Sequence, residues 1–238
     1  MATRSSKDRL FDGLAAVGKA LASGRRLELL DVLSQGERSV ERLAGEIDQS
    51  VANTSAHLHR LSAAGLVTSE RHGNKVVYRL AGPAVEDLWA SLRATAASHA
   101  AGIDRLASDY LGDRARLAQL TRAELAERLA GDPPPVVLDV RPAAEYLAGH
   151  VPGAVSLPPA EVADRVRRLP AGVEVVAYCR GPFCAYADDA VRTLRRRDVR
   201  AWRLEDGFPE WRRAGLPVAV GADVAGTATL ASERRPSP

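Results

Sequence analysis

Cysteine is nearly absent from this chain, which contains two cysteines in 238 residues. Two cysteines cannot build the disulfide framework of a small secreted protein, so we expect the reducing cytoplasm as its compartment. Long apolar runs are also missing, because no stretch approaches the ~18 residues that a membrane helix requires. The N-terminus lacks the apolar centre of a secretory signal. We therefore expect no membrane partner.

No large excess of one charge is present either, since 33 Lys and Arg residues oppose 30 Asp and Glu residues, for a net charge of +3. A mild positive charge is compatible with a polyanionic partner but does not demonstrate one. The hydrophobic content of 46% and charged content of 26% are those of a globular protein. At this length, one large domain or two ordinary domains are expected.

The first 110 residues carry apolar side chains at helical spacing. Gly36 and Gly65 are typical helix stops, and Ser39 is a typical helix cap. These signals predict helices over residues 10–21, 27–33, 40–47 and 51–64. Residues 66–71 and 75–80 are β-prone, and the turn signal His72-Gly73-Asn74 between them predicts a hairpin.

A single long helix is predicted from Pro83 to about Tyr110. Its apolar positions alternate by four and three, in the pattern of a coiled-coil seam: Leu92, Ala96, His99, Ile103, Leu106 and Tyr110. Such a seam requires a second long helix, and the chain has no other. We therefore expect a symmetry mate to supply it, in a homodimer.

Helices followed by a hairpin and a long helix are the element order of a winged helix-turn-helix. The second helix of the turn motif enters the DNA major groove in such folds, and here it is the helix over residues 51–64. Short polar side chains near its start let the backbone approach bases and phosphates. The candidate DNA contacts are Asn53, Thr54, Ser55, His57 and Arg60 on this helix, with Arg71, His72, Asn74 and Lys75 at the hairpin tip. The alternative is a plain helical module with a solvated polar face.

The stretches LASGRRLELLDVLSQGERSVERLAGEI and SVANTSAHLHRLSAAGLVTSERHGNKVVYRL resemble the ArsR/SmtB family of bacterial winged-helix repressors over about residues 10–110. The resemblance implies a homodimer that binds double-stranded operator DNA and is released by an inducer. Many members sense metals, but the helix before residue 51 has no cysteine, and the last helix has Asp87 and His99 without the usual set of acids and histidines. Zinc prefers about four ligands. We therefore expect no metal site and no cofactor.

The second half begins after a junction at residues 112–116. Shortly after this junction, Thr121 and Glu124 form a capping-box pattern that predicts the start of a helix. Apolar runs at 136–140, 154–158, 173–179 and 199–204 alternate with helical stretches near 142–148, 161–169 and 185–197. This alternation predicts an α/β domain with a largely parallel sheet covered on both faces. We expect a mainly α winged helix-turn-helix domain over residues 1–112, an α/β domain over 113–220 and a disordered tail over 221–238.

Both cysteines lie in one short segment, Cys179 to Cys184, between a strand and a helix. We call this segment the cysteine loop. Loop amides, including those of Gly181 and Phe183, and the following helix N-terminus should stabilise an anion there, and Arg180 adds a positive charge. These features predict a lowered pKa for the Cys179 thiol, which favours its nucleophilic thiolate. The alternative is a buried, inert cysteine at a strand end.

The stretches LDVRPAAEYLAGHVPGAVSLP and VVAYCRGPFCAYADDAVRTLRRRDVRAWRLEDGFPEWRRAGLPV resemble the rhodanese family over about residues 117–218. The resemblance implies that Cys179 carries a persulfide and that Asp139 and Arg141 help to orient the loop. It implies mainly structural roles for the remaining matches: Glu145, His150, Gly153, Phe208 and Trp211.

Cys184 departs from the rhodanese pattern, because many sulfurtransferases have a basic or hydroxyl residue late in this loop. A second thiol can resolve a persulfide on Cys179, although Cys184 can also be an apolar filler at the helix start. The sequence predicts a DNA-binding repressor that senses sulfane sulfur or an oxidant through Cys179 and Cys184. One alternative is a working sulfurtransferase at Cys179. A further alternative is arsenate or phosphate-ester chemistry, although such relatives usually have a loop one residue longer.

Overall fold

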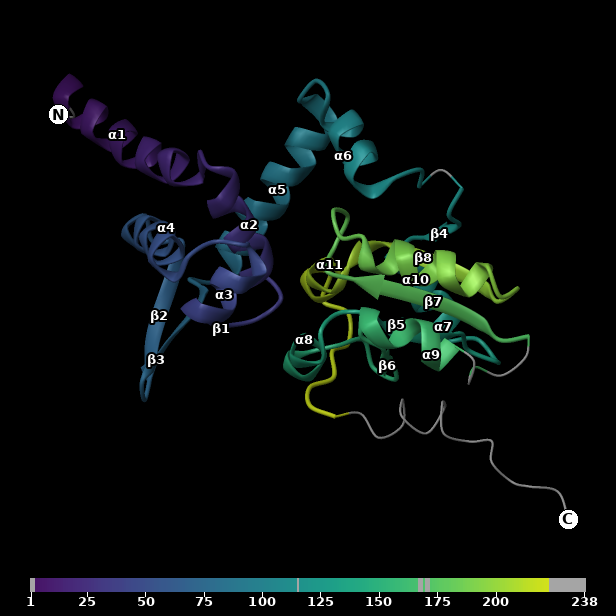
Figure 1. Ribbon diagram of the computed structural model, residues 1–238. Helices are drawn as coiled ribbons and strands as arrows, with labels where there is room; N and C mark the ends of the chain where they lie inside the picture. The colour runs from purple at the N-terminus through teal and green to yellow at the C-terminus, as the bar shows by residue number, and fades with distance from the viewer. Residues whose placement is uncertain (1–2, 115, 167–168, 170–171, 223–238) are drawn as a thin grey trace, which may run out of the picture. The chain divides into compact units, whose positions relative to one another are not determined.

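The structure is a computed structural model that describes residues 3–114, 116–166, 169 and 172–222 (Figure 1). It divides into two compact units, residues 1–101 and 102–238. The predicted boundary at residue 112 falls after a helix that the structure groups with the second unit. Most of the predicted tail, from residue 223 onward, lies outside the described residues.

The first unit contains the predicted helices and hairpin. Its helices are α1 (Arg4–Leu21), α2 (Gly24–Leu33), α3 (Val40–Glu46), α4 (Val51–Ala63) and α5 (Pro83–His99). The hairpin strands β2 (Val67–His72) and β3 (Lys75–Leu80) pair in antiparallel fashion, and the short strand β1 (Arg38–Ser39) joins the other edge of β3. Leu29, Leu43, Leu58 and Leu61 are fully buried in its core. This arrangement confirms the winged helix-turn-helix prediction.

The single long helix predicted to Tyr110 is wrong. The helix α5 ends at His99, and a separate helix, α6 (Ile103–Leu111), follows it. Gly102 lies between them with a φ of 87°, a left-handed conformation that glycine adopts without steric cost and that cannot continue a helix. The predicted seam is therefore divided between two helices, and its last two members, Leu106 and Tyr110, are 65% and 72% exposed.

The second unit contains a five-stranded parallel sheet in the order β4-β8-β7-β5-β6 with helices on both faces (Figure 1). The strands are β4 (Gln119–Leu120), β5 (Val136–Asp139), β6 (Val155–Ser156), β7 (Glu174–Cys179) and β8 (Arg200–Gly207). The helices are α7 (Arg122–Leu129), α8 (Ala143–Ala148), α9 (Val162–Arg165), α10 (Tyr186–Arg195) and α11 (Phe208–Arg213), with the short 3-10 helix η1 (Pro159–Glu161). The prediction of a covered parallel sheet is confirmed, as is the capping box at Thr121.

The central strand β7 places its residues alternately on the two faces of the sheet, as a strand must. Ala177 and Cys179 pack into the core beneath α10, whereas Tyr178 packs into the opposite core with Phe208 and Trp211. The cysteine loop therefore begins at the carboxyl end of a fully buried strand. In parallel α/β sheets this is the edge at which functional groups collect.

The neighbouring strand β8 ends beside the cysteine loop at Gly207, which pairs with Cys179. A Cβ atom placed on Gly207 would lie 2.3 Å from the amide nitrogen of Gly181 and 2.4 Å from the carbonyl carbon of Arg180. Both are backbone atoms, which cannot rotate away as a flexible side chain can. The close packing of the loop against β8 thus requires glycine at residue 207.

We expect Gly207→Ala to destabilise the second unit by about 3 kcal/mol, because overpacking against backbone forces the loop or the strand to shift. Gly215→Ala is a suitable control, since its φ of +70° is unfavourable for alanine but no atom lies within 4 Å of the added Cβ; it should cost about 1 kcal/mol. Denaturant unfolding measures both. Equal losses in the two variants would contradict the steric argument.

Candidate functional site

The cysteine loop is a tight turn between β7 and α10, in which the Cys184 amide donates to the Gly181 carbonyl oxygen at 3.1 Å. Both cysteines are free thiols. Cys179 is only 1% exposed, whereas Cys184 is partly exposed. The Cys179 thiol donates to the Cys184 carbonyl oxygen at 3.5 Å, so the two ends of the loop are in direct contact.

The two thiols have opposite pKa shifts. Burial raises the pKa of Cys179 well above its ordinary value, so the predicted lowering at this residue is wrong. The pKa of Cys184 is lowered, first by a hydrogen bond from the Cys179 thiol and then by the backbone amides of Arg180 and Tyr186. Cys179 therefore holds its proton and Cys184 is the thiol that ionises more readily. The charges and amides near Cys179 are visible in the sequence, but the burial of its sulfur is not.

Of the two predicted loop amides, that of Gly181 acts on the Cys179 sulfur and favours its ionised form, although less strongly than burial opposes it. The Phe183 amide stays a prediction. The positive charge of Arg180 acts on Cys184 and lowers its pKa. The Arg180 guanidinium is itself held by the buried carboxylate of Glu145, with Nε 3.0 Å from Oε1. Arg180 thus joins the loop to α8.

Asp139 and Arg141 form a buried ion pair at the end of β5, and neither side chain is exposed to solvent. The Asp139 carboxylate accepts from the Arg141 backbone amide and guanidinium at 3.0 Å, and from the Tyr178 hydroxyl at 2.7 Å. Burial opposes the charge on Arg141, but the Asp139 carboxylate outweighs it and raises the pKa of Arg141. The pair is therefore bonded to Tyr178, the residue before Cys179; its role in orienting the loop stays a prediction.

The other residues of the predicted rhodanese signature are also structural in their contacts. The His150 ring stacks on Tyr146 with centroids 3.7 Å apart, and its Nδ1 lies 2.9 Å from the Tyr146 carbonyl oxygen. Gly153 adopts a φ of 75° in the turn before β6. Phe208 and Trp211 are buried in the core opposite Cys179.

A second set of charges beneath the loop was missed by the sequence analysis. The Asp188 carboxylate, in the first turn of α10, is fully buried between two arginines. Arg203 of β8 places Nε 2.6 Å from Asp188 Oδ1, and Arg114 places Nε 2.5 Å from Asp188 Oδ2. Arg114 also donates to the carbonyl oxygens of Pro182 and Cys184 in the loop. Its position in an apparent interdomain junction offered no signal of this role.

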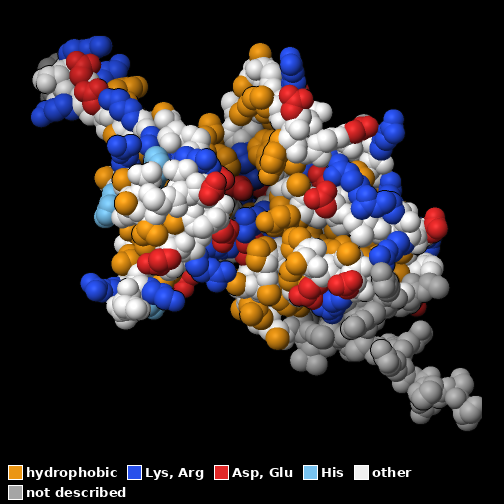
Figure 2. All heavy atoms as spheres, viewed as in Figure 1, with side chains coloured by type: hydrophobic (Ala, Val, Ile, Leu, Met, Phe, Trp, Pro, Cys, Tyr) orange, Lys and Arg blue, Asp and Glu red, His pale blue; other side chains and the backbone are white. Residues whose placement is uncertain are grey.

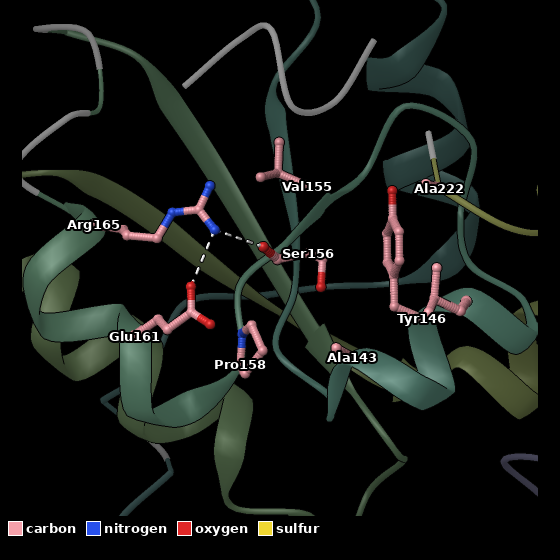
Figure 3. A pocket seen from close by; sticks show the side chains of 9 residues that line it. Ala143, Tyr146, Val155, Ser156, Pro158, Glu161, Arg165 and Ala222 are labelled. Atoms are coloured by element: carbon pink, nitrogen blue, oxygen red, sulfur yellow. Dashed lines mark hydrogen bonds and ion pairs between the residues drawn. The ribbon is translucent and has the colours of Figure 1, made fainter. Parts of the chain in front are cut away.

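A hollow of about 250 Å³ lies at the other edge of the sheet, beside β6, α8 and η1 (Figure 3). In the close-up, Arg165 reaches Glu161 at 3.2 Å and the Ser156 carbonyl oxygen at 3.3 Å. Tyr146 and Val155 supply apolar walls. Neither cysteine lines this hollow, so it is separate from the thiol chemistry.

The orientation of α4 exposes some of the DNA contacts predicted on this helix and buries another. Asn53 and Arg60 are exposed, and Ser55 and His57 are partly exposed, but Thr54 is completely buried and cannot face DNA. Thr54 is wrong because it precedes the core residues Leu58 and Leu61 by four and seven positions and so shares their face.

His59 on α4 is exposed as well, but it was not among the predicted DNA contacts. Burial lowers the pKa of the partly exposed His57, with a further contribution from the charge of Arg26.

All four predicted residues at the hairpin tip are exposed: Arg71, His72, Asn74 and Lys75. Figure 2 shows Lys and Arg side chains on either side of this tip. The described part of the chain contains no cluster of three His, Cys, Asp or Glu side chains suited to a metal ion. No helix among the described residues is long and apolar enough to cross a membrane.

Comparison with known families assigns both parts of the chain. Residues 23–69 match the bacterial regulatory protein, arsR family, and residues 121–214 match the rhodanese-like domain. The solution structure of the homodimeric winged helix-turn-helix domain Mb0332 from Mycobacterium bovis is 42% identical, with a TM-score of 0.40, and covers 42% of this chain and 93% of that chain.

Two curated relatives match different extents of the chain. A sulfurtransferase of Allochromatium vinosum is 30% identical over 43% of this chain and 94% of its own length. The HTH-type transcriptional regulator Rv0324 of Mycobacterium tuberculosis is 47% identical over 92% of this chain and 95% of its own length. The match extends across both units, so the chain belongs to the ArsR family of HTH-type transcriptional regulators and carries a rhodanese-like domain after its winged helix-turn-helix.

Proposed function

We propose that this regulator binds operator DNA as a homodimeric repressor and that reactive sulfur acting on the cysteine loop lowers its affinity. The observation that carries the proposal is the pair of free thiols in one turn, with a raised pKa at Cys179 and a lowered pKa at Cys184. An accessible thiol with a lowered pKa, next to a second cysteine, is the arrangement of a reactive cysteine and its resolving partner.

The effector in this proposal is a hydropolysulfide, which supplies both sulfur and oxidising equivalents. The Cys184 thiolate attacks the terminal sulfane sulfur of HSS⁻, a new S–S bond forms, the old S–S bond breaks and HS⁻ leaves. The Cys179 thiol then attacks the Cys184 sulfur, and the persulfide sulfur leaves with the thiol proton as a second HS⁻. The product is a Cys179–Cys184 disulfide, with the two cysteines oxidised by two electrons and the S–S bond of the hydropolysulfide reduced by two electrons to give two sulfides.

The order of the two cysteines differs from what the rhodanese resemblance implies, which is a persulfide on Cys179. Exposure and acidity support Cys184 for the first attack, because a thiolate accessible to solvent reacts faster than a buried thiol. The contact between Cys179 and the Cys184 backbone supports the second step, since the two ends of the loop already touch.

The DNA-binding half of the proposal rests on α4 and the hairpin tip. Exposed Asn53, His59 and Arg60 lie on α4, the helix that enters the major groove in this fold. Arg71 and Lys75 extend the basic surface to the wing, where contact with phosphates is expected. A coupling free energy of about 1–3 kcal/mol between loop and operator would change the affinity by about five- to 150-fold.

Sulfur transfer is a second candidate function, favoured by the match to the sulfurtransferase of Allochromatium vinosum. Against turnover of an anionic donor, the guanidinium of Arg180 is occupied by Glu145. Steady release of product from thiosulfate and an acceptor thiol, abolished by Cys179→Ser, would establish catalysis. A single round of modification without turnover is the result expected of a sensor.

At neutral pH we expect iodoacetamide to modify Cys184 before Cys179. The lowered pKa of Cys184 increases its thiolate fraction below the ordinary thiol pKa, whereas the raised pKa and burial of Cys179 keep that thiol protonated until alkaline pH. Peptide mass spectrometry against pH measures both rates. Faster labelling of Cys179 at neutral pH would reverse the proposed order.

Inorganic polysulfide should weaken binding of the full chain to a duplex selected from a random-sequence library by about fivefold or more. Cys184→Ser should abolish the response, and Cys179→Ser should retain an added sulfur on Cys184 without forming a disulfide. Fluorescence anisotropy gives the affinity and mass spectrometry gives the modification. Unchanged wild-type affinity, with both cysteines demonstrably modified, would exclude the sensing proposal.

Arg60→Gln should weaken binding to the same duplex by about 1–3 kcal/mol, since Arg60 is exposed on the helix that reads bases. Thr54→Val is the matched control: Thr54 is buried, and its hydroxyl has no hydrogen-bond partner among the described residues. Removing that hydroxyl should leave affinity unchanged and stabilise the fold by about 1 kcal/mol. Loss of affinity in Thr54→Val would place this residue at the DNA after all.

A further inference from the structure

Arg114 connects the cysteine loop to the segment that follows α6. Its guanidinium donates to the Asp188 carboxylate, to the Pro182 carbonyl oxygen and, at 2.9 Å, to the Cys184 carbonyl oxygen. The side chain is 20% exposed, so most of it lies inside the domain. All three acceptors belong to the cysteine loop or to the first turn of α10.

The carbonyl oxygen of Cys184 accepts hydrogen bonds both from Arg114 and from the Cys179 thiol. It accepts from Arg114 Nη2 at 2.9 Å and from the Cys179 thiol at 3.5 Å. When Cys179 becomes part of a disulfide, its S–H donor is lost. The bond also imposes its own geometry on the two residues, because a disulfide requires a Cβ···Cβ separation of about 3.5–4.5 Å. The oxidation state of the loop therefore acts on the carbonyl that Arg114 binds.

The charges around Arg114 make its surroundings sensitive to the charge on the two sulfur atoms of the loop. Arg114 and Arg203 share the single carboxylate of Asp188, so this cluster has one positive charge more than it has negative charges. Arg203 is 2% exposed and its Nη2 is buried without a hydrogen-bond partner among the described residues. A sulfur anion in the loop would offset the surplus charge, and a neutral disulfide would not.

Side chains of α10 donate hydrogen bonds to backbone carbonyl groups both before and after Arg114 in the chain. Arg192 donates to the Leu111 carbonyl oxygen at the end of α6, and Arg195 donates to the Arg116 carbonyl oxygen, each at 3.0 Å. A displacement of Arg114 thus acts on backbone that α10 holds at Leu111 and at Arg116. The end of α6 is held by the same helix that begins beside the cysteine loop.

We propose that Arg114 is a positioning residue of the cysteine loop and the residue through which the state of the two thiols reaches the segment after α6. This inference rests on the proposed sensing function, and it names the contact through which a change at the thiols reaches the segment after α6. In the reduced protein Arg114 fixes the loop carbonyls and supplies positive charge near the sulfurs. Disulfide formation changes the position and surroundings of the Cys184 carbonyl, and Arg114 passes that change to the described backbone beside it, at residues 111–114 and 116.

The first test is the pH profile of iodoacetamide labelling in the full chain. Arg114→Gln removes a cation that favours thiolates, so its labelling profile should shift to higher pH, and the rate at neutral pH should fall by about threefold or more. Arg114→Lys, which keeps the charge, should restore most of the rate. If Arg114 only held the loop closed, Arg114→Gln would instead label faster at every pH, and that result would overturn the positioning role.

The second test compares the loss of operator affinity after polysulfide treatment. Arg116→Gln is the matched control, because Arg116 lies in the same segment and its side chain is 89% exposed, with an ion pair to exposed Asp113. Wild type and Arg116→Gln should lose affinity by about fivefold or more, and Arg114→Gln by less than about twofold. Mass spectrometry must show equal disulfide formation in all three.

The outcomes separate the two proposals. If wild type forms the disulfide but keeps its operator affinity, both the sensing function and the route through Arg114 are contradicted. If wild type and Arg114→Gln lose operator affinity equally after polysulfide treatment, the sensing function stands and the route through Arg114 is overturned. If Arg114→Gln fails to fold, Arg114→Lys decides, because lysine cannot reproduce the fork of the guanidinium: a response equal to that of wild type would exclude the route, and a reduced response would support it.

Discussion

The buried carboxylate of Asp188 is the constraint on which the arrangement of the second unit's cysteine loop depends. It lies between Arg203 from β8 and Arg114 from the segment after α6, and it belongs to the first turn of the helix that follows the loop. Breaking a buried ion pair by removing one partner typically costs about 3–5 kcal/mol, because the remaining charge is left uncompensated. This one side chain therefore fixes a strand, a helix start and the segment after α6 together.

Three buried ion pairs surround the loop from different sides. Asp139 with Arg141 supports the end of β5, Glu145 with Arg180 joins the loop to α8, and Asp188 with its two arginines lies beneath α10. Of these charges, that of Arg180 was the one expected from the sequence to stabilise an anion in the loop. The charges of the first two pairs are compensated, whereas the Asp188 cluster keeps one surplus positive charge. The remaining chemistry is concentrated in the two thiols.

The opposite pKa shifts of those thiols follow from their different depths. Cys179 ends a strand covered on both faces, so its sulfur is removed from water, and burial raises its pKa. Cys184 lies five positions later on the outer side of the turn, where two backbone amides and the Cys179 thiol favour its ionised form. A short loop at the end of a buried strand is enough to make two chemically identical groups unequal. This inequality is what a sensor with ordered steps requires.

Much of this protein could be read from its sequence. Helical and alternating patterns predicted both folds, and the spacing of Cys179 and Cys184 located the candidate site, because local periodicity and turn chemistry are written in adjacent residues. Tertiary structure alone decided that Thr54 faces the core, that Gly102 divides the predicted long helix, and that Cys184 rather than Cys179 is the more acidic thiol. It also brought Arg114 to a loop about seventy residues away. Burial and long-range pairing arise from the packing of distant segments, and no local pattern encodes them.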